Sequence, residues 1–130
     1  MITCEIITPN GPYKTLTCDS LTVGTIDGER GLLEHHMPIV LILDISKLVL
    51  HKGSDDDIYA ITGGMLYFEK GQAKVLVDAI EAKNEIDIDR ANSAKNRAED
   101  RLNNKDENID TRRAEVALKK AINRIRIASL

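Results

Sequence analysis

Two kinds of sequence are joined at residues 86–91, which read Ile-Asp-Ile-Asp-Arg-Ala. Before this point, glycine, proline and threonine punctuate short runs of alternating apolar residues, a pattern typical of β-strands. After it there is no glycine and no proline, and alanine, arginine, lysine and aliphatic residues recur at helical spacing. The sequence therefore predicts a β-rich domain over residues 1–85 and a helical domain over residues 86–130.

Short strands are expected throughout the first domain, over residues 2–8, 13–17, 20–26, 39–45, 47–51, 58–62, 65–69 and 74–79. The run at 39–45 is continuously apolar, which predicts a strand buried on both faces. Residues 27–31 are expected to form a glycine-bounded loop and residues 54–57 an acidic turn, with a further break at Gly63 and Gly64. Many short strands at regular spacing predict a β-sandwich or flattened barrel.

Two helices are expected after Asp87, whose carboxylate is suited to cap a helix N-terminus. A break at 103–106 and a second helix starting near 108–110 predict antiparallel neighbours. Alanine buries little area, so these helices are expected to be stable individually and weakly docked. The predicted contact stripes are Ala91, Ala94, Ala98 and Leu102 in the first helix, and Ala114, Ala117, Ala121, Ile125 and Ala128 in the second.

Cationic residues recur along both predicted helices at the same spacing of seven and four, which places them on one face of each helix. In a hairpin the two faces line one cationic groove suited to polyphosphate, because guanidinium groups match phosphate oxygens; a solvated basic surface is the alternative. The residues are Arg90, Arg97 and Arg101 in the first helix and Arg113, Lys120 and Arg124 in the second.

Arg90 closely follows Ile86 and Asp87. Together they offer an apolar wall, an acceptor for an exocyclic amine and a cation, which are the groups that an adenine nucleotide requires. Because Asp87 already occupies the helix N-terminus, the phosphates are expected to bind arginines and not free backbone amides.

Composition argues against several other classes of function. The chain starts without a basic segment followed by an apolar one, and no apolar run is long enough to span a bilayer, so a cytoplasmic protein is expected. Residues 1–85 carry 7 basic and 13 acidic side chains, against 11 and 8 in residues 86–130. A nucleic-acid-binding hairpin on an acidic scaffold is one alternative, but one Phe, three Tyr and no Trp offer few stacking platforms.

A small enzyme using His35, His36 or His51 is another alternative. Adjacent strand residues point to opposite faces, so His35 and His36 are not expected to share a metal ion, and no catalytic residue is assigned. Cys4 and Cys18 lie equally far from Gly11, so a hairpin turning there brings two buried thiols near each other.

Several stretches of the chain, taken in order, resemble the epsilon subunit of bacterial F-type ATP synthases over nearly the whole length. They are Glu-Ile-Ile-Thr-Pro-Asn-Gly at 5–11, Gly-Glu-Arg-Gly-Leu-Leu at 28–33, His-Met-Pro at 36–38, Ala-Ile-Thr-Gly-Gly at 60–64, Ile-Asp-Ile-Asp-Arg-Ala at 86–91 and Arg-Ala-Glu-Val-Ala-Leu-Lys-Lys-Ala-Ile-Asn-Arg at 113–124.

The resemblance implies an α+β protein with an N-terminal ten-stranded β-sandwich and a C-terminal antiparallel two-helix hairpin. It implies a non-catalytic central-stalk (rotor) subunit that couples the gamma subunit to the c-ring of a proton-translocating ATP synthase. The protein is then peripheral to the cytoplasmic side of the bacterial membrane. Its hairpin inhibits ATP hydrolysis by extending into the alpha/beta catalytic head. The rotor interface implied by the matching loops comprises Glu29, Arg30, Gly31, His36, Met37 and Pro38.

In bacillus-like members of the family the folded hairpin binds ATP as a regulatory ligand, through the pattern Ile/Leu-Asp-x-x-Arg-Ala. Lys120 stands where the tightest binders have arginine, and an epsilon subunit that inhibits mechanically without binding ATP is the alternative. No resident cofactor or metal is expected. The ATP-binding residues implied here are Glu81, Ile86, Asp87, Arg90, Ala91, Arg97, Arg113, Lys120 and Arg124.

Overall fold

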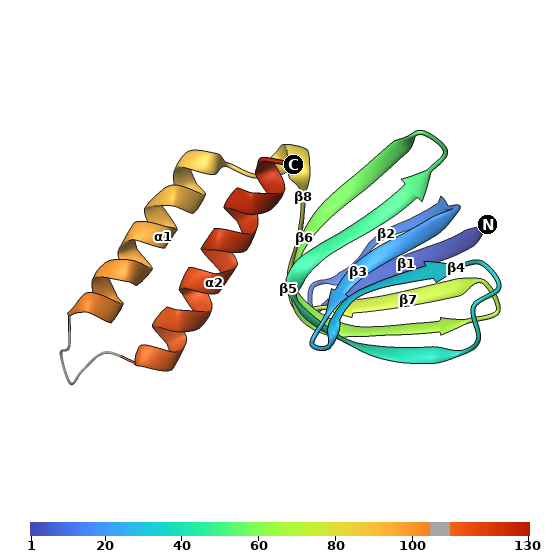
Figure 1. Cartoon of the computed structure of the whole chain (residues 1–130), viewed down its shortest axis with the longest axis horizontal. Helices are drawn as coiled ribbons and strands as arrows, with labels where there is room; N and C mark the ends of the chain where they lie inside the picture. Colours follow the sequence, from blue (N-terminus) through green and yellow to red (C-terminus); the bar gives the residue numbers. More distant parts are fainter. Residues whose placement is uncertain (105–109) are drawn as a thin grey trace. The chain divides into compact units, whose positions relative to one another are not determined.

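A computed structural model describes residues 1–104 and 110–130 (Figure 1). The chain divides into two compact units, residues 1–83 and 84–130, and each is described by itself. The boundary predicted from the sequence lies two residues further along, between 85 and 86. The α+β class, a β-sandwich followed by two helices in contact, is confirmed.

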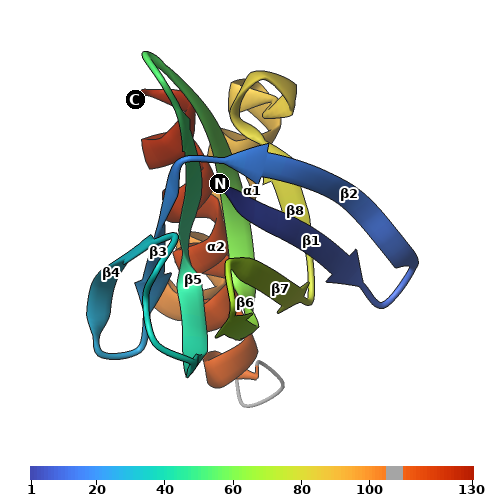
Figure 2. The ribbon, with the colours of Figure 1, turned by 90° about the vertical axis from the view of Figure 1, so that its right-hand side faces the viewer.

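The first unit is one continuous sheet folded into a sandwich (Figures 1 and 2). Its strands are β1 (Ile2–Thr8), β2 (Gly11–Cys18), β3 (Ser20–Thr25), β4 (Gly28–Leu33), β5 (Ile39–Lys52), β6 (Asp55–Glu69), β7 (Gln72–Val77) and β8 (Ile80–Ala82). The order is β2-β1-β7-β6-β5-β3-β4, with β8 paired to β6. All pairs are antiparallel except β1 with β7.

Residues 1–83 hold eight strands, so the expectation of ten is corrected. The runs at 39–45 and 47–51 form the single strand β5, and those at 58–62 and 65–69 form β6. Gly63 and Gly64 therefore lie inside a strand, with φ angles of 108° and 144°. Only glycine adopts such positive φ angles readily. The two glycines therefore let β6 bend at the place where the sequence predicted a turn.

Two predicted loops are shorter than expected, because the turns need only two residues each. Between β3 and β4 the turn is Ile26 and Asp27, and β4 starts at Gly28, whose φ is 114°. The turn between β5 and β6 is Gly53 and Ser54. The aspartates at 55–57 are already part of β6, where cross-strand partners fix them: Lys52 Nζ lies 2.7 Å from Asp57 Oδ2.

The first half of β5 is buried on one face only, which corrects the expected two-sided burial. Leu41 and Leu43 are buried, whereas Val40 and Ile42 are 52% and 46% exposed. A strand in a two-layered sandwich has one face toward the core, so its side chains alternate even where the sequence is apolar throughout.

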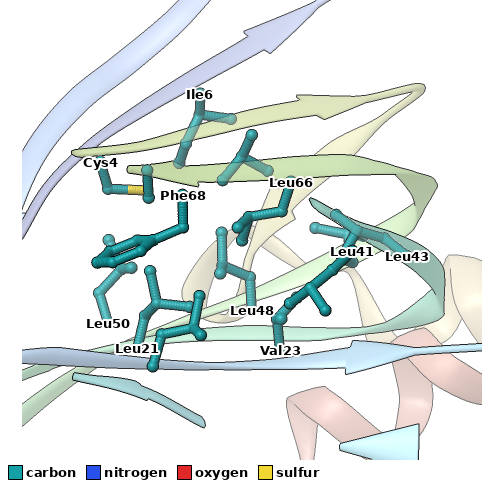
Figure 3. Close-up of a cluster of buried hydrophobic side chains, with 14 of the residues drawn as sticks. Cys4, Ile6, Leu21, Val23, Leu41, Leu43, Leu48, Leu50, Leu66 and Phe68 are labelled. Carbon is teal, nitrogen blue, oxygen red and sulfur yellow. The ribbon is translucent and has the colours of Figure 1, made fainter. Parts of the chain in front are cut away.

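The core fills the space between the layers with aliphatic side chains around Phe68 (Figure 3). Cys4 and Cys18 are both fully buried in it, and the β1–β2 register places Cys4 opposite Leu16 and Cys18 opposite Ile2. They are thus diagonal neighbours, as the hairpin prediction implied. Burial raises the pKa of the Cys4 thiol to about 12 and also raises the pKa of the Cys18 thiol, which favours the protonated form of both.

The second unit is formed by α1 (Ile88–Asn103) and α2 (Thr111–Ala128), which lie side by side and run in opposite directions (Figure 1). The first helix ends at Asn103, the first residue of the predicted break, and Asn104 is its C-cap. The remainder of the predicted break, and residues 108–109 of the predicted second start, lie outside the described residues. No helix in the described parts of the chain has the length and apolarity needed to cross a membrane.

Candidate functional site

The start of α1 is fixed by Asp87, as the sequence predicted. Asp87 has an extended backbone, with φ −84° and ψ 104°, and its Oδ1 accepts a hydrogen bond from the backbone N–H of Arg90 at 3.1 Å. This bond satisfies one of the free amides of the first turn. Arg90 is held in the first turn as a result, with its guanidinium exposed to solvent.

The two helices meet along a seam of alanine. Ala91 and Ala98 of α1 and Ala114 and Ala121 of α2 are all at most 2% exposed. The other predicted seam residues, Ala94, Leu102, Ala117, Ile125 and Ala128, are half-buried, and Ile127 is buried although the stripe did not include it. Small side chains allow close approach of the helices but bury little apolar area, so the contact is weak.

Six cationic residues line one flank of this seam. Successive residues of an α-helix are about 100° apart around its axis. The residues that directly precede the two buried alanines of one helix therefore lie together on one flank of that helix. In antiparallel helices these two flanks fall on the same side of the pair. The residues three positions after Ala98 and Ala121 lie on that flank as well. We call this surface the cationic face; it comprises Arg90, Arg97, Arg101, Arg113, Lys120 and Arg124.

Carboxylates of the described helices lie on other faces. Glu99 and Glu115 follow buried alanines and so lie on the opposite flank, where Glu99 is 3.8 Å from Lys95 Nζ. Asp89 and Asp100 point away from the seam by the same geometry. Apart from the cap carboxylates of Asp87 and Asp110 at its two ends, the cationic face is therefore positively charged and suited to a polyanion.

The structure brings eight of the nine predicted ATP-binding residues into one compact unit. Among them Arg90, Arg97, Arg113 and Lys120 are exposed, Ile86 and Arg124 are half-buried, and Ala91 is buried. The ninth, Glu81, is a half-buried residue of β8 opposite Ala60 and belongs to the sandwich unit.

The predicted rotor-interface residues lie at one edge and one connection of the sandwich. Glu29, Arg30 and Gly31 are exposed on β4, which is an edge strand, and Glu29 pairs with Lys47 of β5 at 3.6 Å. The other three lie between β4 and β5. In this connection His36 Nδ1 donates to the Met37 carbonyl at 2.7 Å, and Met37 itself is 71% exposed.

An exposed apolar surface on the sandwich was missed from the sequence. It lies on the outer side of β5, β6 and β7, where cross-strand pairs join Val40 to Tyr67, Ile42 to Met65, and Met65 to Leu76. Val40, Ile42 and Tyr67 are 52%, 46% and 43% exposed. Contiguous exposed apolar side chains of this kind mark protein–protein contact surfaces. We call these five residues the outer apolar face.

The three histidines do not form a common site. His35 and His36 lie in the β4–β5 connection and not in a strand, and His51 lies near the far end of β5. His51 Nε2 is 2.9 Å from Thr22 Oγ1 and its Nδ1 is 2.8 Å from Asp56 Oδ1, a network that ties β3, β5 and β6 together. Across residues 1–104 and 110–130, no cluster of three or more His, Cys, Asp or Glu has the arrangement of a metal site.

Two family profiles cover almost the whole chain. The profile described as "ATP synthase, Delta/Epsilon chain, beta-sandwich domain" matches residues 1–83, and "ATP synthase, Delta/Epsilon chain, long alpha-helix domain" matches residues 84–129. The ATP synthase epsilon chain of Halalkalibacterium halodurans is 41% identical over 125 residues, covering 95% of this chain and 94% of that protein. The epsilon chain of Bacillus cytotoxicus is 40% identical over 126 residues, covering 97% and 95%.

Solved structures share the fold. A chain of the Euglena gracilis mitochondrial ATP synthase, seen by cryo-EM with OSCP, F1 and c-ring, superposes with a TM-score of 0.83 at 23% identity; the match covers 94% of the present chain and 78% of that one. A chain of the Tetrahymena thermophila mitochondrial ATP synthase central stalk and c-ring gives a TM-score of 0.59 at 14% identity, covering 98% and 93%.

Proposed function

This chain belongs to the delta/epsilon-chain family of ATP synthase, as a non-catalytic epsilon-type subunit of the central stalk, and from that premise we propose two finer roles. The sandwich joins the gamma subunit to the c-ring, which keeps the protein peripheral to the cytoplasmic side of the membrane. The helical unit is a brake on ATP hydrolysis that is released by ATP. The single observation behind the second role is the cationic face beside a weak alanine seam.

The proposed ligand is ATP, bound to the closed hairpin. Ile86, Asp87 and Ala91 supply an apolar wall and a carboxylate acceptor for the adenine, and the cationic face holds the triphosphate. Arginine gives bidentate contacts to phosphate, whereas Lys120 gives only a point charge, which lowers the affinity relative to an all-arginine face.

ATP controls the brake by shifting a population. Six cations on one face repel each other, and the alanine seam opposes this repulsion only weakly. A polyanion that binds the closed pair alone neutralises the repulsion and favours closure. When ATP falls, the helices separate and offer their basic residues to the alpha/beta catalytic head. The shift is no larger than the difference in ATP affinity between the two states.

The test of this role is calorimetric titration of the full chain with ATP, with and without Mg²⁺. Replacing Arg97 and Lys120 together by glutamine removes two charge-assisted contacts, each contributing about 1.5–3 kcal/mol, so we expect affinity to fall by roughly a hundredfold or more. The matched control replaces Arg112 and Arg126, two exposed cations off the cationic face, and is expected to change affinity by no more than about threefold.

Equal losses of ATP affinity in the two double variants would contradict a specific site. They would indicate only a general electrostatic attraction between the basic helices and ATP. Absence of any ATP binding to the unaltered chain would favour the mechanical brake that needs no nucleotide.

The outer apolar face is the proposed contact with the gamma subunit. Replacing Ile42 by lysine places a charge in the centre of this surface, and we expect the affinity for isolated gamma subunit to fall at least tenfold, because burying an unpaired charge is costly. Ile26→Lys is the matched control, since Ile26 is 62% exposed in the β3–β4 turn. Surface plasmon resonance measures both; a larger loss with the Ile26 variant would reject this assignment.

A further inference from the structure

The two helices carry the same sequence signature, displaced by 23 residues. Residues 87–102 and 110–125 align without a gap. Arg97 is matched by Lys120 and Leu102 by Ile125, which preserve charge and apolarity. The identical pairs are Asp87 with Asp110, Arg90 with Arg113, Ala91 with Ala114, Ala94 with Ala117, Ala98 with Ala121, and Arg101 with Arg124.

The matched residues at the two helix starts also have the same local structure. Asp110 caps α2 with φ −75° and ψ 95°, and its Oδ1 accepts from the backbone N–H of Arg113 at 3.1 Å. Asp87 makes the equivalent bond to Arg90 at the same 3.1 Å. The alanine that follows each arginine, Ala91 or Ala114, is buried in the seam. The pattern Asp-x-x-Arg-Ala thus builds the same helix start twice.

Antiparallel packing relates the two starts by an approximate two-fold axis. The axis is perpendicular to both helices and passes through the cationic face, because both flanking rows of cations lie on that side. It exchanges Arg90 with Arg113, Arg97 with Lys120, and Arg101 with Arg124. A ligand approaching the face therefore meets nearly the same arrangement of cap carboxylate, arginine and cations from either end.

We propose that the cationic face accepts an adenine nucleotide in two opposite orientations, with its base toward Asp87 and Ala91 or toward Asp110 and Ala114. This inference rests on the proposed ATP-binding function and adds a second half-site to it. Only one nucleotide binds at a time, because in both orientations the triphosphate extends to the middle of the face, and two such anions repel strongly at short range.

On the cationic face, the two orientations differ in the chemical type of one cation. The start of α1 lies beside the second half of α2, which contributes Lys120 and Arg124. The start of α2 lies beside the second half of α1, which contributes Arg97 and Arg101. Lys120, which weakens phosphate binding in the first orientation, is thus replaced by Arg97 in the second. Because arginine binds phosphate through two hydrogen bonds, the second orientation competes with the first for the nucleotide.

The test compares ATP with inorganic tripolyphosphate, which has the phosphates but no ring, in ¹H–¹⁵N spectra of the full chain. Only the base produces ring-current shifts, so subtracting the tripolyphosphate response maps where the adenine lies. We expect adenine-specific shifts at the amides of both Ala91 and Ala114. Asp87→Asn and Asp110→Asn are the matched variants, because asparagine still caps a helix while the carboxylate charge is lost.

With Asp87→Asn, the adenine-specific shift at Ala91 is expected to shrink and that at Ala114 to persist or grow; Asp110→Asn should give the reverse. Adenine-specific shifts confined to Ala91 in the unaltered chain, and abolished by Asp87→Asn, would overturn the second orientation while leaving ATP binding intact. No adenine-specific shift at either alanine would overturn the proposed function as well, so the two failures are distinct.

Discussion

Replacing Gly64 by alanine is expected to lower the free energy of unfolding of the sandwich by at least about 3 kcal/mol. Gly64 has a φ of 144°, and a Cβ placed there would lie 1.9 Å from the Leu76 carbonyl oxygen. That oxygen belongs to the backbone of β7, which pairs with β6 at this point, so it cannot move aside without breaking the ladder. Urea denaturation followed by circular dichroism measures the loss.

Gly53→Ala is the control for this prediction. Gly53 also has a positive φ, 60°, but a Cβ there meets no atom within 4 Å. Alanine at this position should therefore lower the free energy of unfolding by only about 1 kcal/mol, the cost of a positive φ for a residue with a Cβ atom. If the Gly64 variant were as stable as the Gly53 variant, β6 would be able to relax at its bend. The predicted clash between a Cβ at residue 64 and the Leu76 carbonyl oxygen would then be wrong.

Gly64 also illustrates how far the sequence predicts this fold. The glycine pair marked a change of direction correctly, but glycine is compatible with both a turn and a bend inside a strand. The distinction depends on β7 lying against Gly64, a contact between residues far apart in sequence. The break predicted between residues 62 and 65 was wrong for this reason, whereas the sandwich followed by two helices was predicted from the turn residues and the helical periodicity.

The helix geometry beneath the candidate site is predicted well, because it depends on helical spacing. Asp87 and the alanine stripe identify the start of α1 and its buried side, and the cations at the preceding positions then follow from helix geometry alone. The outer apolar face does not follow in this way. Its members come from three strands, and the apolar run at 39–45 carries no mark of which alternate residues face water. Only the register of β5, β6 and β7 brings Ile42, Met65 and Leu76 into one row.

Replacing Ala121 by leucine is expected to hold the hairpin open and to abolish its response to ATP. Ala121 is 2% exposed in the seam, and the larger side chain forces the helices apart at a cost of about 1–3 kcal/mol. Leucine is nearly as good a helix former as alanine, so each helix persists. This cost lowers the ratio of closed to open hairpins by about 5- to 150-fold. Because ATP binds only the closed hairpin, the apparent ATP affinity falls in proportion to the closed fraction.

Three measurements on Ala121→Leu separate opening from unfolding. Helicity by circular dichroism should stay unchanged, calorimetry should show weakened ATP binding, and ATP synthase assembled with the variant should hydrolyse ATP slowly at every ATP concentration. The matched control, Asn96→Leu, adds leucine to an exposed position of α1 that points away from the seam, and should behave like the unaltered chain. If Ala121→Leu instead left both ATP affinity and inhibition unchanged, closure of the seam would not be the step that ATP controls. The cationic face would then bind nucleotide without acting as a brake.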